Sequence, residues 1–433
     1  MPHNTSSEPS FEKLCVIGLG YVGLPTAAVF ASRGLEVLGV DINPDTVATI
    51  NAGKIHIVEP DLDILVNGAV ATGKLRAATD PAPADAFIIA VPTPFTIERK
   101  PDLSYLDAAA DGLASMLQPG NVVIVESTSP VGATERFSAR LSEQRPDLSF
   151  PGDTGIDTGI APGENTDICV AHSPERVLPG QVLIELTRND RVVGGITPRC
   201  AKRAAALYRM AVDGKCLLTT ARTAELVKLA ENAYRDVSIA FANELANVSE
   251  TLDIDPWEAI ALANHHPRVN ILNPGPGVGG HCIAVDPWFI VDSAPDDTAL
   301  IRAARDVNDA RPARIAAAVT TTAAGLDAPT IACLGLSYKA DIDDLRESAS
   351  IAVVAELARA GFQIVVAEPH VSVLPSALDE LSNVRLASLD DALAAGNVVV
   401  LLTDHREFRE IDSARLDGKR LIDTRGAWSI REN

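Results

Sequence analysis

The sequence predicts an α/β protein in which a central helical domain joins two doubly wound α/β domains. Across residues 1–220, short runs rich in β-branched residues alternate with Ala-rich helical patterns, as in a parallel sheet with helices on both faces. A helical period dominates residues 221–318, and strand-like runs resume in residues 319–433. The predicted strands are LCVIG, EVLGV, AFIIAV, NVVIVES, DICVAH, RVVGG and KCLLTT in the first domain and TIACLGL, FQIVVAE, NVVVLLT and RLIDT in the last.

Composition limits the partners of the protein. Its 433 residues, 47% of them hydrophobic, supply more than one core. The formal net charge of −21 disfavours nucleic acid and anionic lipid, so an anionic ligand must meet a local basic pocket. The polar start MPHNTSSEPSFEK and the short, interrupted apolar runs predict a cytoplasmic protein without a membrane span. Six scattered cysteines without a CxxC pair predict reduced thiols.

A glycine-rich turn follows the first predicted strand and opens a helical pattern. Such a turn can be purely structural, but three glycines in G-x-G-x-x-G spacing also let a backbone approach a pyrophosphate at a helix N-terminus. The next strand ends in Asp41, whose carboxylate would accept hydrogen bonds from a ribose and repel a 2′-phosphate. The sequence therefore predicts NAD as the cofactor. The residues expected to bind it here are Gly18, Gly20, Tyr21, Val22, Gly23 and Asp41.

Polar turns follow two further predicted strands, in the segments AFIIAVPTP and NVVIVESTSPVGAT. In an open parallel sheet, the carboxyl ends of the strands line the ligand crevice. We therefore expect Thr93, Ser127 and Thr128 to face the cofactor or the substrate. The alternative is that they are ordinary turn residues.

The segment NPGPGVGGHCIAVDP, residues 273–287, carries a candidate nucleophile. Four glycines within its first eight residues leave little side-chain bulk, so a ligand could approach the backbone. Cys282 differs from the other cysteines because it lies in this loop, between His281 and the nearby Asp286. A thiol there suits nucleophilic catalysis, and a buried structural cysteine is the alternative. No metal site is expected, because no second ligand pair has suitable spacing.

Residues 223–252 predict one long amphipathic helix, with apolar residues at spacings of three and four. A helix of this length must bury one face, and a partner subunit would cover it. Glu225, Lys228, Asn232 and Arg235 share a face of this helix. They form either a solvated row of ion pairs or, for the lysine and the asparagine, a pair that stabilises an oxyanion beside the cysteine loop.

Two cations follow the first predicted strand of residues 319–433, in a turn without a dinucleotide fingerprint. Lys339 and Arg346 would suit a phosphate-bearing ligand in an otherwise acidic protein. Surface ion pairs with Asp341, Asp343 and Asp344 are the alternative.

Together these motifs resemble the UDP-glucose/GDP-mannose dehydrogenase family, from about Leu14 to Trp428. The matching segments, in family order, are GLGYVGLP, VPTP, ESTSPVG, HSPERVLPG, TAELVKLAENAYRD, GVGGHCIAVDPW and GLSYKADIDDLRES. PERVLPG and HPRVNILNPGPGVGGHCIAVDPWFIV are similar to the branch that acts on UDP-N-acetyl-D-mannosamine. The glucose branch has Phe-x-Lys-Asp where this chain reads Ile283-Ala-Val-Asp286, so the resemblance disfavours glucose.

The resemblance implies an NAD-dependent nucleotide-sugar 6-dehydrogenase, an oxidoreductase that oxidises a UDP-N-acetylhexosamine to its uronic acid for a surface polysaccharide or glycan. It implies an NAD-binding Rossmann domain over residues 1–220 and a central helical domain over residues 221–318, which dimerises and carries the cysteine loop. A Rossmann-like domain over residues 319–433 would bind the UDP moiety. The expected assembly is a homodimer or a higher homo-oligomer.

The family's site residues carry over by motif. The resemblance implies a thioester on Cys282, with Lys228 and Asn232 stabilising the oxyanion and Asp286 assisting proton transfer. Glu175 and Thr128 would help to hydrolyse the thioester. Arg268 would reach the substrate of its own or of the partner subunit. The implied substrate-binding residues are Glu175, Arg176, Lys228, Asn232, Arg268, Gly279, His281, Lys339 and Arg346.

Two rival functions remain open at this point. An ordinary two-electron alcohol dehydrogenase would need neither a thiol nor a second nucleotide domain. A non-enzymatic protein could hold NAD and a nucleotide sugar without turnover. Among substrates, UDP-N-acetylglucosamine and UDP-glucose are the alternatives to UDP-N-acetyl-D-mannosamine.

Overall fold

The computed structural model describes residues 11–57, 59–96, 98–152, 166–177, 180–280 and 283–428. The chain divides into two compact units. Unit 1 consists of Met1–Ala230 and Trp288–Ser293, and unit 2 consists of Glu231–Pro287 and Ala294–Asn433. One long helix, α8 (Ala221–Leu252), belongs to both units, because the boundary falls inside it.

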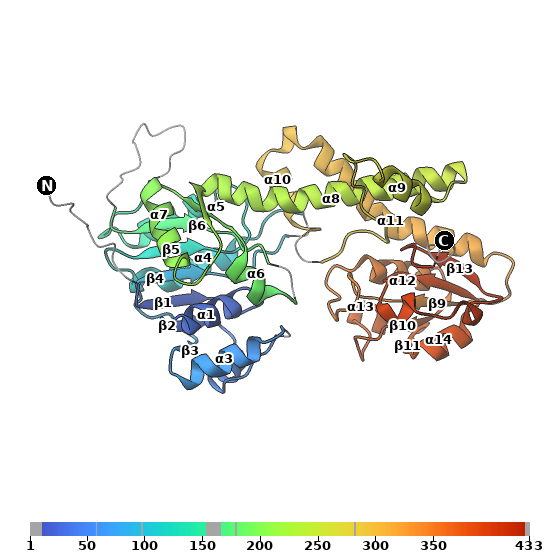
Figure 1. Ribbon diagram of the computed structural model, residues 1–433, viewed down its shortest axis with the longest axis horizontal. Helices are drawn as coiled ribbons and strands as arrows, with labels where there is room; N and C mark the ends of the chain where they lie inside the picture. The colour runs from blue at the N-terminus through green and yellow to red at the C-terminus, as the bar shows by residue number, and fades with distance from the viewer. Residues whose placement is uncertain are drawn as a thin grey trace. The chain divides into compact units, whose positions relative to one another are not determined.

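Unit 1 contains an eight-stranded sheet in the order β3-β2-β1-β4-β5-β6-β7-β8 (Figure 1). Every predicted strand of this part is present, and β3 is an additional strand that the sequence did not predict. The strands are β1 (Lys13–Ile17), β2 (Glu36–Val40), β3 (Leu75–Ala78), β4 (Ala86–Ile89), β5 (Val122–Val125), β6 (Cys169–His172), β7 (Arg191–Gly195) and β8 (Cys216–Thr220).

One strand pair departs from the predicted parallel sheet. β6 and β7 pair antiparallel, with His172 opposite Gly194, whereas the other neighbours in this sheet are parallel. The sheet is therefore parallel, as predicted, except at this pair. The residues of β7 are buried throughout, and a run that is buried on both faces looks the same whichever way the strand points.

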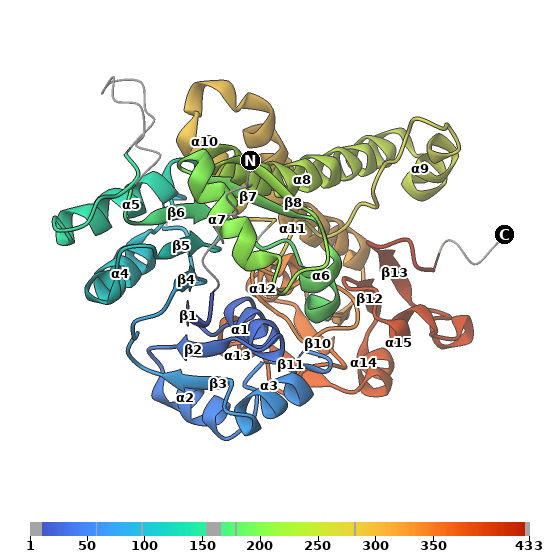
Figure 2. The ribbon, with the colours of Figure 1, turned by 60° about the vertical axis from the view of Figure 1, so that its left-hand side comes forward.

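Helices cover both faces of this sheet, as the alternating pattern predicts. One apolar cluster joins residues of α1, α3 and α7 to Val16 and Ile88, and the other joins residues of α4 and α5 to Cys15 and Phe87 (Figure 2). Adjacent residues of one strand thus enter opposite cores, as a doubly wound fold requires. The helices are α1 (Gly23–Ser32), α2 (Pro44–Asn51), α3 (Leu62–Ala71), α4 (Ser104–Leu113), α5 (Ala133–Gln144), α6 (Val182–Arg188) and α7 (Pro198–Tyr208).

Unit 2 contains a five-stranded, wholly parallel sheet in the order β11-β10-β9-β12-β13. Its strands are β9 (Thr330–Leu334), β10 (Gln363–Ala367), β11 (Val384–Ala387), β12 (Val398–Leu401) and β13 (Arg420–Asp423). The sequence predicted all of them except β11. The helices of this domain are α12 (Ala349–Arg359), α13 (Ser376–Asp379), α14 (Leu389–Ala395) and α15 (Arg406–Arg409). The second α/β domain is therefore confirmed.

The helical part contains α8, α9 (Pro256–Asn264), α10 (Asp286–Ser293) and α11 (Ala299–Ala323). Within unit 2, α8 and α11 are joined by buried polar groups. Arg305 Nη1 lies 2.7 Å from Asp236 Oδ1, and Asn308 Nδ2 donates to the same oxygen at 2.8 Å. None of the helices is long and apolar enough to cross a membrane, as far as the described residues extend.

Candidate active site

The glycines of the turn between β1 and α1 have two different roles. Gly18 has a φ of +92°, and a Cβ there would lie 2.5 Å from the Ala90 carbonyl oxygen. A Cβ on Gly23 would lie 1.7 Å from the Gly18 carbonyl oxygen, so the chain's own packing requires both glycines. A Cβ on Gly20 would meet no atom within 4 Å. The open space beside Gly20, at the N-terminus of α1, fits a pyrophosphate, and Tyr21 and Val22 border it in sequence.

Asp41 holds this turn at the carboxyl end of β2. Its Oδ2 accepts a hydrogen bond from the Leu19 N–H at 3.1 Å, and its Oδ1 accepts one from the Asn43 N–H at 2.9 Å. The side chain is half-buried, so it remains accessible to a ligand. A carboxylate in this place fits a ribose whose hydroxyls donate to it.

Two hydroxyls join the turns that follow β4 and β5. Thr93 Oγ1 donates to the Thr128 carbonyl oxygen at 2.6 Å, and Ser127 Oγ donates to the Val91 carbonyl oxygen at 2.7 Å. Thr93 and Ser127 are buried, whereas Thr128 is half-buried. The structure thus brings the three predicted residues together and makes the first two braces between the turns.

The polar face of α8 is buried, so the solvated row of ion pairs is the wrong interpretation for Glu225, Lys228 and Asn232. Glu225 accepts hydrogen bonds from the backbone N–H groups of Gly132 and Thr134, at 2.7 and 2.8 Å. It therefore caps the N-terminus of α5, and burial raises its pKa to about 7. Periodicity could not find this role, because the partners lie 91 and 93 residues away.

Glu175 follows β6, and its Oε1 accepts a hydrogen bond from the Val177 N–H. Burial raises the pKa of Glu175 to about 7, and the Lys228 cation opposes that shift. The structure thus brings these two predicted residues within electrostatic reach in unit 1. A carboxyl group that changes its protonation near neutral pH suits general acid–base chemistry. The neighbouring Arg176 is half-buried and donates from Nη1 to the Asp190 carbonyl oxygen at 3.1 Å.

In unit 2, Asn232 and Asp286 form a buried pair. Asn232 Nδ2 donates to Asp286 Oδ2 at 2.5 Å, and Asn232 Oδ1 accepts from Arg235 Nη2 at 2.6 Å. The two bonds fix the orientation of the amide. Asp286 begins α10, directly after the cysteine loop. Two predicted site residues 54 positions apart in the chain are therefore in contact.

The glycines of the cysteine loop pack against the chain itself. A Cβ on Gly277 would lie 2.9 Å from Ala349 Cβ, and one on Gly279 would lie 2.6 Å from Tyr338 Cβ. The Gly280 N–H donates to the Arg346 carbonyl oxygen at 3.1 Å. The glycines therefore allow this backbone to lie on the segment that carries Lys339 and Arg346. His281 and Cys282, the other predicted residues of the loop, lie outside the described residues.

The base of the same loop is anchored by residues that the sequence did not single out. The Gly275 N–H donates to Asn243 Oδ1 at 2.8 Å, and Arg311 Nε donates to the Gly275 carbonyl oxygen at 3.1 Å. Asn243 is fully buried and Arg311 nearly so. The available signal was two asparagines, Asn243 and Asn247, one turn apart on the same face of the helix.

The remaining predicted cations lie on the surface of unit 2. Arg346 pairs with Asp344, with Nη2 and Oδ2 2.6 Å apart, so this ion pair of the alternative interpretation is present. Lys339 is exposed and forms no ion pair within the described part of the chain. Arg268 is exposed, with Nη2 3.5 Å from the His266 ring. Their contacts with substrate remain predictions.

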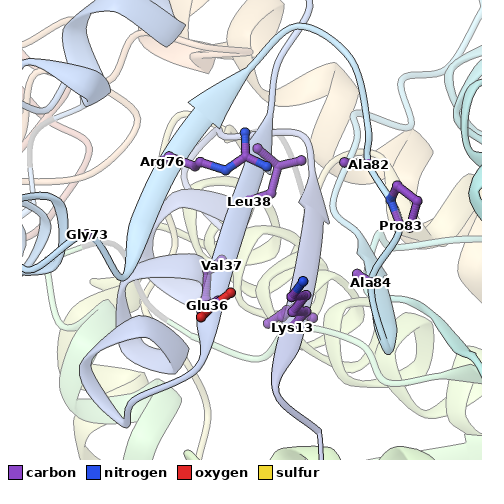
Figure 3. A pocket seen from close by; sticks show the side chains of 10 residues that line it. Lys13, Glu36, Val37, Leu38, Gly73, Arg76, Ala82, Pro83 and Ala84 are labelled. Atoms are coloured by element: carbon purple, nitrogen blue, oxygen red, sulfur yellow. The ribbon is translucent and has the colours of Figure 1, made fainter.

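A cavity of about 150 Å³ in unit 1 lies away from these groups. Lys13 and Glu36, the first residues of β1 and β2, line it together with Arg76 of β3 (Figure 3). The glycine turn and Asp41 follow the carboxyl ends of β1 and β2, and ligands of open α/β sheets bind at that end. The cavity is therefore not the cofactor crevice.

Family models match the chain in three consecutive parts. They describe the UDP-glucose/GDP-mannose dehydrogenase family and cover its NAD binding domain at residues 12–212, its central domain at 222–310 and its UDP binding domain at 332–430. The chain belongs to this family. It is an NAD-dependent nucleotide-sugar dehydrogenase with Rossmann-like N- and C-terminal domains, and a UDP-sugar is its class of substrate.

Curated relatives match over nearly their whole length. An NDP-N-acetyl-D-galactosaminuronic acid dehydrogenase from Ralstonia nicotianae is 56% identical over 422 residues, 97% of each chain. A UDP-N-acetyl-D-mannosamine dehydrogenase from Campylobacter jejuni is 53% identical over 408 residues, 94% of this chain and 98% of the relative.

Solved structures share the fold. A UDP-D-ManNAc dehydrogenase from Pyrococcus horikoshii superposes with a TM-score of 0.84 at 38% identity, covering 97% of this chain and 96% of the other. An NDP-N-acetyl-D-galactosaminuronic acid dehydrogenase from Methanosarcina mazei gives a TM-score of 0.80 at 28% identity, covering 96% and 92%.

The position of Asp41 leads to a prediction about cofactor choice. Asp41→Ala should raise the KM for NAD roughly tenfold to a hundredfold, because a hydrogen bond to a charged group contributes about 1.5–3 kcal/mol. The preference over NADP should narrow, since the negative charge that repels the 2′-phosphate is gone. Steady-state kinetics with both cofactors measures this. Asp63→Asn, which neutralises an exposed carboxylate on α3, is the control, and an unchanged NAD/NADP ratio in Asp41→Ala would exclude Asp41 from the adenosine site.

Proposed function

We propose that this dehydrogenase oxidises carbon 6 of UDP-N-acetyl-D-mannosamine to the uronic acid, through a thioester on Cys282, for a surface polysaccharide or glycan. The observation that carries the site assignment is the buried Asn232–Asp286 pair directly after the cysteine loop. It joins an amide of α8 to the carboxylate of Asp286, which follows the proposed nucleophile closely in sequence. The proposed division into residues 1–220, 221–318 and 319–433 follows the change from strand patterns to helical patterns and back.

The proposed reaction is a four-electron oxidation. NAD bound at the turn between β1 and α1 would supply the hydride acceptor, and two successive NAD molecules would serve the two oxidations of carbon 6. The Cys282 thiolate would add to the aldehyde formed first and hold the carbon as a thiohemiacetal and then as a thioester, which water would cleave to the carboxylate and the free thiol. Because the intermediate stays on the sulfur, no reactive aldehyde is released.

Each further residue has one proposed role. Lys228 and Asn232, one turn apart on α8, stabilise the oxyanion that forms when the thiolate adds to the aldehyde. Asp286 relays a proton, and its contact with Asn232 couples the two groups. Glu175 activates the hydrolytic water with Thr128, since its pKa of about 7 leaves a basic carboxylate at neutral pH. The nucleotide sugar is contacted by six further residues: Arg176, Arg268, Gly279, His281, Lys339 and Arg346.

The N-acetylmannosamine assignment rests on PERVLPG and on the long match around the cysteine loop. The relative at 53% identity carries the name of this activity. A galacto-configured N-acetylhexosamine is the second candidate, because the relative at 56% identity is named for N-acetyl-D-galactosaminuronic acid. Both names share the N-acetyl group, which supports a UDP-N-acetylhexosamine over UDP-glucose.

We further propose that the protein is a homodimer formed through α8. Four large apolar side chains, Tyr234, Phe241, Val248 and Leu252, lie at steps of seven or four and are 47% to 73% exposed. Residues at these steps share one face of a helix, and a second copy of the same face would cover them. The free thiols among the described cysteines are in keeping with a cytoplasmic enzyme.

Cys282→Ser tests the thioester. The variant should bind NAD and the UDP-sugar but lose uronate formation by several orders of magnitude, because a hydroxyl is the poorer nucleophile and forms no thioester. The assay is NADH released per sugar, with UDP-linked N-acetylmannosamine, N-acetylgalactosamine, N-acetylglucosamine and glucose. Wild type should release two NADH per N-acetylmannosamine, and Cys216→Ser, a cysteine of β8, should behave as wild type. One NADH per sugar would instead identify a two-electron alcohol dehydrogenase. Release of no NADH would identify a non-enzymatic binding protein.

The raised pKa of Glu175 predicts a pH profile. Below pH 7 the carboxyl group is protonated and cannot accept a proton from water, so thioester hydrolysis should speed up as pH rises through about 7. Glu175→Gln should flatten this rise and leave an acylated Cys282, detectable by intact-protein mass spectrometry. Glu143→Gln, an exposed change on α5, is the control. A Glu175→Gln profile that overlays the wild type would remove Glu175 from the hydrolytic step.

The exposed apolar side chains of α8 predict the quaternary structure. Phe241→Glu combined with a charged residue at Ile239, its half-buried neighbour, should yield monomers or aggregates. Burying a large apolar side chain contributes roughly 1.5–3 kcal/mol, and each copy would lose it. Light scattering at micromolar concentration measures the mass. Leu300→Glu, an exposed leucine on α11, should remain dimeric, and a wild-type mass of one chain would contradict the proposal.

A further inference from the structure

The two α/β domains begin with the same loop frame. β1 leads into Gly18-Leu-Gly-Tyr-Val-Gly23, and β9 leads into Gly335-Leu-Ser-Tyr-Lys-Ala340. Gly18 and Gly335 have φ values of +92° and +96°. Their N–H groups donate to the carbonyl oxygen of the last residue of the neighbouring strand, Val40 at 2.8 Å and Ala367 at 2.9 Å. The second loop therefore keeps the backbone course of the first at its start.

A carboxylate holds each loop at the same place. The Leu19 N–H donates to Asp41 Oδ2 at 3.1 Å, and the Leu336 N–H donates to Glu368 Oε2 at 2.7 Å. Asp41 directly follows β2 and Glu368 directly follows β10, the strands that pair with β1 and β9. Asp41 is half-buried, whereas Glu368 is 6% exposed. The second domain thus has a carboxylate acceptor at the same place as the first domain, but this carboxylate is buried.

Both oxygens of Glu368 are taken by the chain itself. Oε2 also accepts from the Ser337 N–H at 3.1 Å and from His405 Nε2 at 3.1 Å, while Oε1 accepts from the His370 N–H at 3.0 Å. Burial opposes the charged form, but the hydrogen bonds from His405 and the backbone outweigh it and lower the pKa of Glu368. Because these donors occupy both oxygens of the charged carboxylate, it cannot bind the hydroxyls of a ribose.

Ser337 stands at the loop position that Gly20, with open space beside it, has in the first domain. Its side chain is fully buried, and its Oγ donates to the Lys339 carbonyl oxygen at 2.8 Å. The same Oγ lies 3.2 Å from His405 Nε2. His405 Nδ1 accepts from the Asp341 N–H at 2.9 Å, so the ring carries its proton on Nε2 and directs it at Glu368 and Ser337.

A metal ion is the rival explanation of this cluster. Ligand atoms of Asp341, His370 and His405 lie within 4.8 Å of one another. However, both ring nitrogens of His405 already take part in hydrogen bonds, one as acceptor and one as donor. No lone pair of that ring is left for an ion, so the hydrogen-bonded explanation is the better one.

We propose that Glu368, His405 and Ser337 are positioning residues that hold residues 336–341 in the shape that presents Lys339 to the phosphates of the nucleotide sugar, and that close this domain to a dinucleotide. The cluster binds the backbone of the loop at Leu336, Ser337, Lys339 and Asp341, on both sides of the lysine. The inference rests on the proposed role of Lys339 at the nucleotide-sugar site.

The test uses the full-length enzyme and compares Glu368→Gln with Asp41→Asn, the same change at the same place in the other domain. Glu368→Gln should weaken UDP binding, measured by calorimetry, by about tenfold or more and leave the NAD affinity within about twofold. Asp41→Asn should instead weaken NAD binding and leave the UDP affinity within about twofold. An equal loss of both affinities in Glu368→Gln would show a general structural role and overturn the proposal.

Hydrogen–deuterium exchange measures how firmly the loop backbone is held, without any ligand present. The peptide that contains residues 336–341 should exchange faster in Glu368→Gln and in His405→Ala. His405→Gln should recover part of the UDP affinity, because its amide can still donate toward Glu368. Ser337→Gly, which restores the residue of the first loop and should fold, ought to weaken UDP by a smaller factor. Faster exchange with unchanged UDP affinity would overturn the proposal.

Two further measurements separate the alternatives. Lys339→Met should weaken UDP without changing the exchange of the loop, and normal UDP binding by this variant would refute the role of Lys339 in the proposed function. The exchange of the loop in Glu368→Gln would still decide the positioning role on its own. Treating the wild type with a chelator should not change UDP affinity, whereas a loss restored by zinc would identify a metal site and overturn the hydrogen-bonded explanation.

Discussion

The buried polar network between α8 and α11 is the interaction on which the cysteine loop depends. Asp236, Arg305 and Asn308 join the two helices, and Asn243 and Arg311 extend the network to both backbone groups of Gly275. Breaking a buried ion pair by removing one partner costs about 3–5 kcal/mol, because the other charge stays buried. The exposed Arg314–Glu250 pair joins the same helices and contributes roughly 0–1 kcal/mol. Burial therefore makes the first pair, and not the second, the constraint on the loop.

The glycines that follow this anchor let the loop backbone pack closely against the rest of unit 2. From Gly275 the chain passes over Ala349 and Tyr338 at distances that no Cβ would allow, and the Gly280 N–H binds the Arg346 carbonyl oxygen. The segment that leads to the proposed nucleophile and the segment that carries the proposed phosphate-binding lysine are thus packed as one piece of unit 2. On the far side of the cysteine in sequence, Asp286 is held by Asn232 of α8.

The strands that sequence reasoning missed show what hydrophobic pattern can detect. β3 reads LRAA and β11 reads VRLA, and each is a four-residue strand at the edge of its sheet with an exposed arginine. The arginine interrupts the apolar residues of each segment, so neither segment stood out from a loop. The direction of β7 was missed for the opposite reason, because RVVGG is buried throughout and is compatible with either direction.

By itself, the sequence determined the elements whose cause is local. The glycine turn, Asp41 at the end of its strand and the long helix were all predictable, because backbone conformation and helical period depend on neighbouring residues. The tertiary structure decided which distant group satisfies each buried charge. Glu225 caps a helix 91 residues away, Asn232 meets Asp286 over 54 residues, and Glu368 binds His405 over 37. A buried polar group must find a partner, but its own spacing in the chain does not say which one, because that depends on how the elements pack.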